Sequence, residues 1–103
     1  MAHRDVLDAL FRDYATRAEA IRRDLARSHS ADFAEQAQQR QNDEVLEALL
    51  AEAEHGLLLV QQAQQRLADG RYGQCLCCGE PIEAARLAAM PVAQYCLSCA
   101  QFN

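Results

Sequence analysis

The sequence predicts a mainly α-helical protein in which an antiparallel two-helix coiled-coil hairpin, residues 1–69, precedes a small four-cysteine module, residues 70–103. Residues 1–69 contain no Pro and only one Gly, Gly56, and they are rich in Ala, Leu, Gln, Glu and Arg, which favour helices. The other three Gly, both Pro and all five Cys residues follow. A chain of 103 residues can bury only a small core.

Apolar residues recur at steps of three and four along both predicted helices, which is typical of a coiled coil. The first seam is Leu7, Leu10, Tyr14, Ala18, Ile21 and Leu25. The second seam is Leu46, Leu50, Ala53, Leu57, Val60, Gln64 and Leu67. Between them, residues 28–32 break the apolar period, and Asp32 followed by Glu35 resembles a helix-capping pair. We therefore expect a hairpin tip near residues 28–37, roughly 35 to 40 Å from the base at about 1.5 Å per residue.

Four cysteines stand as two Cys-x-x-Cys pairs, Cys75/Cys78 and Cys96/Cys99, with 17 residues between the pairs. Each pair can present two thiolates on a tight turn, and the intervening segment is long enough to fold back. Four sulfurs can then surround one zinc ion at about 2.3 Å. Gly73 and Gly79 flank the first pair, where the backbone must turn sharply. We interpret this module as a zinc finger that holds one structural zinc ion.

A disulfide framework is an alternative use of paired cysteines. The first 74 residues contain no Cys, and the charged start Met1–Asp5 lacks the apolar core of a signal peptide, so the sequence favours a reducing cytoplasm. The aliphatic run Leu57–Val60 is far shorter than a membrane span. The formal net charge of −5 opposes binding to a phosphate backbone, which favours a protein partner over direct DNA binding.

The cysteine module resembles the zinc finger of the DksA/TraR family of bacterial transcription factors. The positions that match in register are Tyr72, Gly73, Cys75, Cys78, Gly79, Ile82, Arg86, Leu87, Ala89, Pro91, Ala93, Cys96 and Cys99. The resemblance continues upstream without a gap, where the tip pattern Asp-x-x-Asp-x-Ala of the family falls on Asp32, Glu35 and Ala37. About 70 residues carry the resemblance, and residues 1–31 agree mainly in helical pattern.

The resemblance implies a monomeric, non-enzymatic factor that binds bacterial RNA polymerase. Such a factor inserts its coiled-coil tip through the secondary channel, and in the family this shortens the lifetime of promoter complexes, often together with the alarmone guanosine tetraphosphate. A slim helix pair can enter a pore that excludes a globular domain. The carboxylates at the tip could then act near the magnesium of the polymerase active site.

Departures from the family pattern modify these expectations. Glu35 stands where longer members have Asp, so its carboxylate lies one methylene farther out. Residues 41–65 contain no Arg or Lys, although DksA-type members carry basic residues there that help to hold the alarmone. Because a tetraphosphate needs cationic partners, we expect guanosine tetraphosphate to increase the effect of this protein less than that of a DksA-type factor. The chain also lacks the long amino-terminal extension and the carboxy-terminal helix of longer members, so we interpret it as a compact DksA-like paralogue.

Two other classes of function stay open at this point. A structural or adaptor zinc protein would use the leucine-rich seams to dimerise or to bind another partner, whereas a hairpin factor should be monomeric. A thiol enzyme or redox switch would use Cys75, Cys77 and Cys78. We interpret Cys77 first as a spectator thiol beside the metal. His29 and His55 are expected to be solvated. Gly56 marks either a close approach of the helices or a flexible point.

Overall fold

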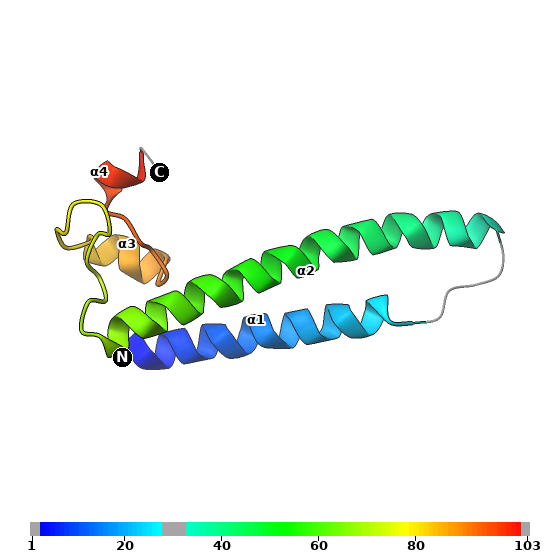
Figure 1. The fold of residues 1–103 in the computed structure, drawn as a ribbon, viewed down its shortest axis with the longest axis horizontal. Helices are drawn as coiled ribbons and strands as arrows, with labels where there is room; N and C mark the ends of the chain where they lie inside the picture. Colours follow the sequence, from blue (N-terminus) through cyan, green and yellow to red (C-terminus); the bar gives the residue numbers. More distant parts are fainter. Residues whose placement is uncertain (1–2, 28–32, 102–103) are drawn as a thin grey trace. The chain divides into compact units, whose positions relative to one another are not determined.

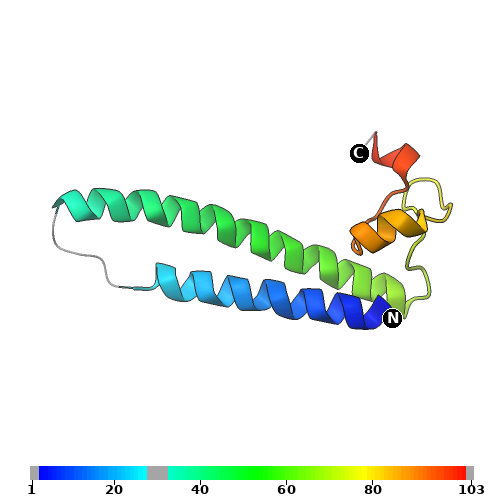
Figure 2. The ribbon, with the colours of Figure 1, turned by 180° about the vertical axis from the view of Figure 1, so that it is seen from behind.

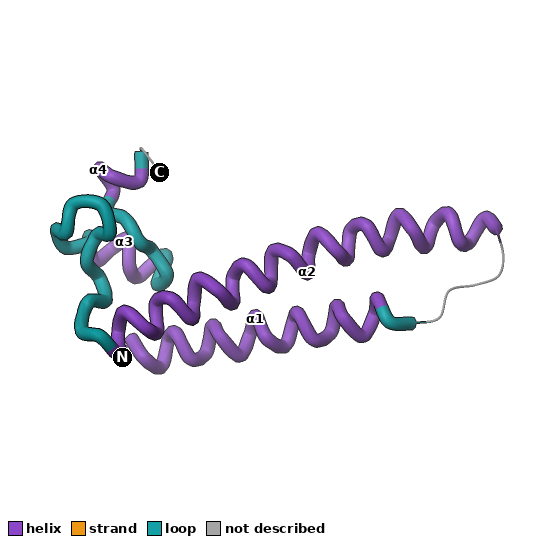
Figure 3. The backbone as a smooth tube through the Cα atoms, in the orientation of Figure 1, coloured by secondary structure: helices purple, strands orange, loops and turns teal. Residues whose placement is uncertain are grey.

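The computed structural model describes residues 3–27 and 33–101 of the chain. Within these ranges the protein has four helices and no strand (Figures 1 and 3): α1 His3–Leu25, α2 Phe33–Ala68, α3 Ala84–Ala89 and α4 Leu97–Ala100. The prediction of a mainly helical fold is confirmed. None of the described helices combines the length and the apolar character that a membrane span requires.

The chain divides into two compact units, and the boundary between them crosses both long helices. One unit is Arg12–Leu57, which contains most of α1 and the first part of α2. The other unit combines Met1–Phe11 with Leu58–Asn103, so it contains the start of α1, the end of α2 and the whole cysteine module. Within each unit α1 and α2 run antiparallel and side by side (Figures 1 and 2).

The two heptad seams are the faces on which α1 and α2 pack. Every residue of both predicted seams is buried or half-buried. In the unit Arg12–Leu57 the most buried seam residues are Ala18 and Ala53, and a hydrogen bond of 3.3 Å from Arg22 Nη2 to Glu54 Oε2 joins the two helices beside them. In the other unit Leu7 and Val60 are fully buried. The apolar period of the sequence therefore identified the contact faces.

Gly56 lies where the ring of Tyr14 packs against α2. A Cβ atom built on Gly56 would lie 2.5 Å from Cε1 of Tyr14 and 2.7 Å from Cδ1 and Cζ, which is closer than carbon atoms approach. Gly56 is buried inside the continuous helix α2. Of the two readings of this glycine, the close approach of the helices is the correct one.

We expect Gly56→Ala to destabilise the protein by about 1 kcal/mol. Alanine gains about 1 kcal/mol in helix propensity over glycine, but overpacking against the Tyr14 ring costs roughly 1 to 3 kcal/mol. In a Tyr14→Ala background the ring is gone, so the same Gly56→Ala change should stabilise the protein instead. Urea denaturation of the four chains of this double-mutant cycle measures the coupling. An equal effect of Gly56→Ala in both backgrounds would rule out the contact.

The end of α2 turns the chain into the cysteine module through Gly70. The N–H of Arg71 donates to the carbonyl of Arg66 at 2.8 Å, and the N–H of Gly70 donates to Leu67 at 3.2 Å. Gly70 has a φ of 73°, the left-handed conformation that this helix ending requires. The ring of His3, at the start of α1, lies 4.7 Å from that of Tyr72 between ring centroids.

Candidate metal centre

The first Cys-x-x-Cys pair lies on a tight turn that two glycines permit. Gly73 and Gly79 have φ values of 85° and 78°, so the predicted sharp turns on either side of the pair are confirmed. The N–H of Cys75 donates to the carbonyl of Glu80 at 2.8 Å, and that of Gly79 donates back to Cys75 at 3.0 Å. A bridge between Gln74 and Pro81 closes the base of the turn. These bonds hold Cys75 and Cys78 on one side of the turn.

The second pair is positioned by the short helix α4. Cys96 immediately precedes this helix and Cys99 lies within it, and the N–H of Ala100 donates to the carbonyl of Cys96 at 2.9 Å. Glu83 Oε1 accepts a hydrogen bond of 3.1 Å from the N–H of Leu97, the first residue of α4. Backbone N–H groups, its own and that of Leu97, lower the pKa of Glu83, so the carboxylate that caps this helix stays ionised.

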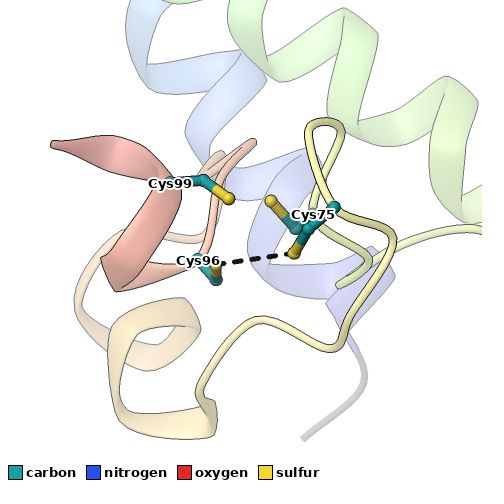
Figure 4. Close-up of side chains that lie close together, drawn as sticks. Cys75, Cys96 and Cys99 are labelled. Carbon is teal, nitrogen blue, oxygen red and sulfur yellow. Dashed lines mark hydrogen bonds between the residues drawn. The ribbon is translucent and has the colours of Figure 1, made fainter. Parts of the chain in front are cut away.

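The fold brings four sulfurs from the two pairs together. The Sγ atoms of Cys75, Cys78, Cys96 and Cys99 all lie within 4.8 Å of one another. Cys78 Sγ and Cys96 Sγ are 3.8 Å apart. A tetrahedral zinc site with bonds of about 2.3 Å has sulfur–sulfur edges of roughly 3.8 Å. Figure 4 shows the side chains of Cys75, Cys96 and Cys99 directed toward a common centre.

The electrostatics of the cluster suit a divalent cation. Burial opposes ionisation of Cys75, but the backbone N–H groups of Cys78, Cys96 and Cys77 outweigh it and lower the pKa of Cys75 to about 6. Hydrogen bonds with the side chains of Cys77 and Cys96 raise the pKa of Cys99, because they stabilise its protonated form, and burial raises it further. A zinc ion would favour the thiolate instead, and thiolates are the soft ligands that zinc accepts. The residues present therefore fit the metal.

A small core supports the sulfur cluster from the side. Buried Ile82 and Ala93 pack with Cys75 and Cys96, and half-buried Leu87, Tyr95 and Cys99 pack against them. Two long side chains brace this core: Tyr72 donates its hydroxyl to the carbonyl of Pro91 at 2.8 Å, and Arg86 Nε donates to the carbonyl of Tyr95 at 2.8 Å. The sequence pointed to Tyr72, Arg86 and Leu87 only through the family resemblance. In the structure Tyr72 and Arg86 brace the core, and Leu87 packs against it.

The predicted tip residues are less fully described than the cysteines. Asp32 and His29 lie outside the described residues, and α2 begins at Phe33, directly after Asp32. Glu35 belongs to the first turn of α2, and Ala37 is exposed on the same helix. His55 is exposed, as expected for a solvated residue.

The fold and the cysteine cluster define a helical protein with a C4-type zinc finger. Residues 70–102 match the family model described as the prokaryotic dksA/traR C4-type zinc finger. The chain belongs to the DksA/TraR family, because the similarity to solved structures extends over nearly its whole length. The family resemblance of the sequence is confirmed, and the protein is a DksA-like transcription factor with one structural zinc ion.

Two solved structures carry this similarity. Transcription factor DksA2 from Pseudomonas aeruginosa is 31% identical, with a TM-score of 0.87 over 97% of this chain and 78% of that chain. The DnaK suppressor protein from Agrobacterium tumefaciens C58 is 31% identical, with a TM-score of 0.66 over 98% of this chain and 90% of that chain. No curated protein matches the sequence significantly.

Cys77 is expected to be dispensable for zinc binding. Its side chain is exposed and does not belong to the group of four mutually close sulfurs, although it contacts Cys99. We expect Cys77→Ser to retain one zinc ion per chain, whereas Cys96→Ser, the matched control at a buried sulfur, should lose most of it. Elemental analysis of protein purified under reducing conditions measures both. Loss of zinc from Cys77→Ser alone would change the set of ligands.

Proposed function

We propose that this protein binds bacterial RNA polymerase and inserts its coiled-coil tip through the secondary channel, where it modulates the stability of promoter complexes and the initiation of transcription. The single observation that supports this most is the similarity to transcription factor DksA2 over 97% of the chain, which includes both long helices as well as the zinc finger. The site of action we infer is cytoplasmic, and the factor acts as a monomer.

The proposed zinc ligands are Cys75, Cys78, Cys96 and Cys99. Four thiolates complete a tetrahedral coordination sphere and leave no open position for water or substrate, which is typical of structural zinc. The role of the metal in this proposal is to hold the two turns of the module together, and the protein needs no catalytic residue of its own.

The proposed acting groups are the carboxylates of Asp32 and Glu35, with Ala37 as the small residue beside them. Asp32 directly precedes the first residue of α2, and Glu35 and Ala37 follow within its first two turns. Carboxylate oxygens are the ligands that Mg²⁺ prefers, so a tip that reaches the polymerase active centre can alter the surroundings of its metal ions. Affinity comes from the sides of the helix pair and from the zinc module.

The alarmone contributes little in this proposal. Between Arg40 and Arg66 the helix α2 carries no cation, while Asp43, Glu44, Glu47, Glu52 and Glu54 make the same stretch acidic. The next arginine along α2, Arg66, is 7% exposed and so offers little surface. An alarmone with four phosphates would therefore meet repulsion from α2 rather than ion pairs.

Transcription from a ribosomal-RNA-type promoter with the cognate polymerase tests the proposal. We expect the protein to shorten the lifetime of the promoter complex, and guanosine tetraphosphate to add little to this effect. A competition binding assay with a known secondary-channel factor measures affinity on the same samples, and light scattering measures the oligomeric state. A dimer in solution without affinity for polymerase would favour the structural or adaptor zinc protein instead.

A further inference from the structure

Arg66, in the last turn of α2, is a buried arginine with which no carboxylate of the described residues forms an ion pair. The residue is 7% exposed, and its Nη2 atom is buried without a hydrogen-bond partner. Asp69, the nearest acidic residue along the chain, accepts instead from Gln65 Nε2 and from Arg71 Nη2, each at 3.1 Å. Because desolvation of an unpaired charge is costly, a buried cation of this kind needs a negative charge nearby.

Arg66 lines the same cavity as Cys75, one of the four clustered cysteines. The cavity has a volume of about 580 Å³. One wall is the end of α2, and the other wall consists of segments of the cysteine module on either side of α3. A hydrogen bond of 2.9 Å from Gln94 Nε2 to Gln62 Oε1 joins the two walls. All of these residues belong to the unit that contains the cysteine module, so the cavity is internal to that unit.

The cysteine cluster is the source of negative charge at this cavity. Four thiolates exceed the two positive charges of Zn²⁺, so a centre that holds the metal keeps two negative charges. No Asp or Glu is among the residues that line the cavity. Cys75 is therefore the lining residue that is anionic when zinc is bound, and it lies on the wall opposite Arg66.

Arg71, the second arginine of the lining, differs from Arg66 in its surroundings. Its side chain is 63% exposed and pairs with Asp69, so water and a carboxylate already offset its charge. Burial lowers the pKa of Arg66, Tyr72 opposes this, and the positive charge of Arg71 lowers it again. Charges interact more strongly in a poorly solvated region than at the surface. Arg66 is therefore the arginine that a nearby anionic centre affects most.

We propose that Arg66 is a positioning residue of the zinc centre, which strengthens metal binding by offsetting the negative charge of the thiolate ligands across this cavity. Groups outside the ligand shell commonly change metal affinity by about 10- to 100-fold. In return, the anionic centre offsets the desolvation of Arg66. A water molecule in the cavity can accept a hydrogen bond from Nη2, but it does not supply the charge. This inference rests on the proposed set of zinc ligands and not on polymerase binding.

Chelator competition with the zinc-loaded full chain measures the zinc affinity of two variants. Arg66→Met keeps a long apolar stem in the cavity wall and removes the charge, so we expect it to lower zinc affinity by about 10-fold. Arg66→Lys keeps the charge and should retain most of the affinity. Arg71→Gln, at the exposed arginine of the same cavity, is the matched control and should leave zinc affinity unchanged.

Cobalt(II) in place of zinc gives a second readout that a change in packing alone would not move. Loss of a positive charge beside a thiolate lets an electron leave the sulfur more readily, so the energy of sulfur-to-cobalt charge transfer falls. Arg66→Met should therefore shift the charge-transfer band to longer wavelength, and Arg66→Lys should not. The visible d–d bands, which report tetrahedral geometry, should stay in place in both variants.

Three results would overturn the role of Arg66. The first is an unchanged zinc affinity in Arg66→Met. The second is a loss in Arg66→Lys equal to or greater than that in Arg66→Met, which would make packing the function of this side chain. The third is a charge-transfer band that does not move in Arg66→Met. Absence of zinc from the unmodified protein would overturn the proposed ligand set together with this inference, and none of the readouts depends on polymerase.

Discussion

Removal of zinc with a strong chelator is expected to unfold the cysteine module while most of the helical signal remains. The module's core contains three of the four clustered cysteines, Cys75, Cys96 and Cys99, beside only a few apolar side chains. Structural zinc contributes on the order of 10 kcal/mol or more to small domains of this kind. The long helices α1 and α2 have 23 and 36 residues, against 6 and 4 in α3 and α4.

Far-ultraviolet circular dichroism should therefore change little on chelation. Near-ultraviolet signals should fall strongly. Two of the three tyrosines, Tyr72 and Tyr95, lie in the cysteine module, and the chain has no Trp. Readdition of zinc under reducing conditions is the control, and it should restore both signals. Protein that contains no stoichiometric zinc after purification under reducing conditions, or a module that keeps its near-ultraviolet signal without metal, would contradict this expectation.

Asp32→Asn is expected to abolish the effect on transcription with little change in affinity for polymerase. The substitution keeps the size of the side chain and removes its charge, so a carboxylate that acts at the active centre loses its function. Asparagine is as good a helix-capping residue as aspartate, so the start of α2 should be preserved and circular dichroism should be unchanged. The promoter-lifetime and competition binding assays on the same sample separate action from binding.

Glu35→Gln is the comparison for this variant, and it should lower activity more mildly because the longer side chain is placed less rigidly. Glu44→Gln makes the same chemical change at an exposed position of α2 beyond the tip, and should leave activity near that of the unmodified protein. Full activity of Asp32→Asn would remove the tip from the mechanism. The factor would then be a polymerase-binding blocker or an unrelated zinc adaptor.

The fold was predictable from the sequence to the extent that it depends on periodic patterns. The heptad positions from Leu7 to Leu25 and from Leu46 to Leu67 are all buried or half-buried, because a seam that repeats every 3.5 residues has one face to bury. The zinc centre was predictable for a similar reason. Each Cys-x-x-Cys pair defines its own turn, so the only long-range step was the return of Cys96 and Cys99 to the first pair.

Features that depend on contacts between distant residues were not predictable in this way. The contact between Tyr14 and Gly56 involves residues on different helices, and the sequence left two readings of the glycine open. Arg66 lies in the last turn of α2, where a basic residue is common, and nothing in the sequence indicates that it is buried. The functions of Asp32 and Glu35 depend on a partner, so neither the sequence nor the helix pair determines them.

The seven-residue repeat of the seam determines which changes in the length of the helix pair preserve its packing, in evolution or in design. An insertion of seven residues in each helix restores the same contact faces, and lengthens the pair by about 10 Å at roughly 1.5 Å per residue. An insertion of three or four residues shifts the seam, so the helices must locally unwind or overwind to keep positions such as Ala18 and Ala53 buried. The cysteine module has its own core, so it does not constrain such a change. Relatives with longer or shorter helix pairs can therefore arise by adding or removing seven residues in each helix, while the metal centre stays the same.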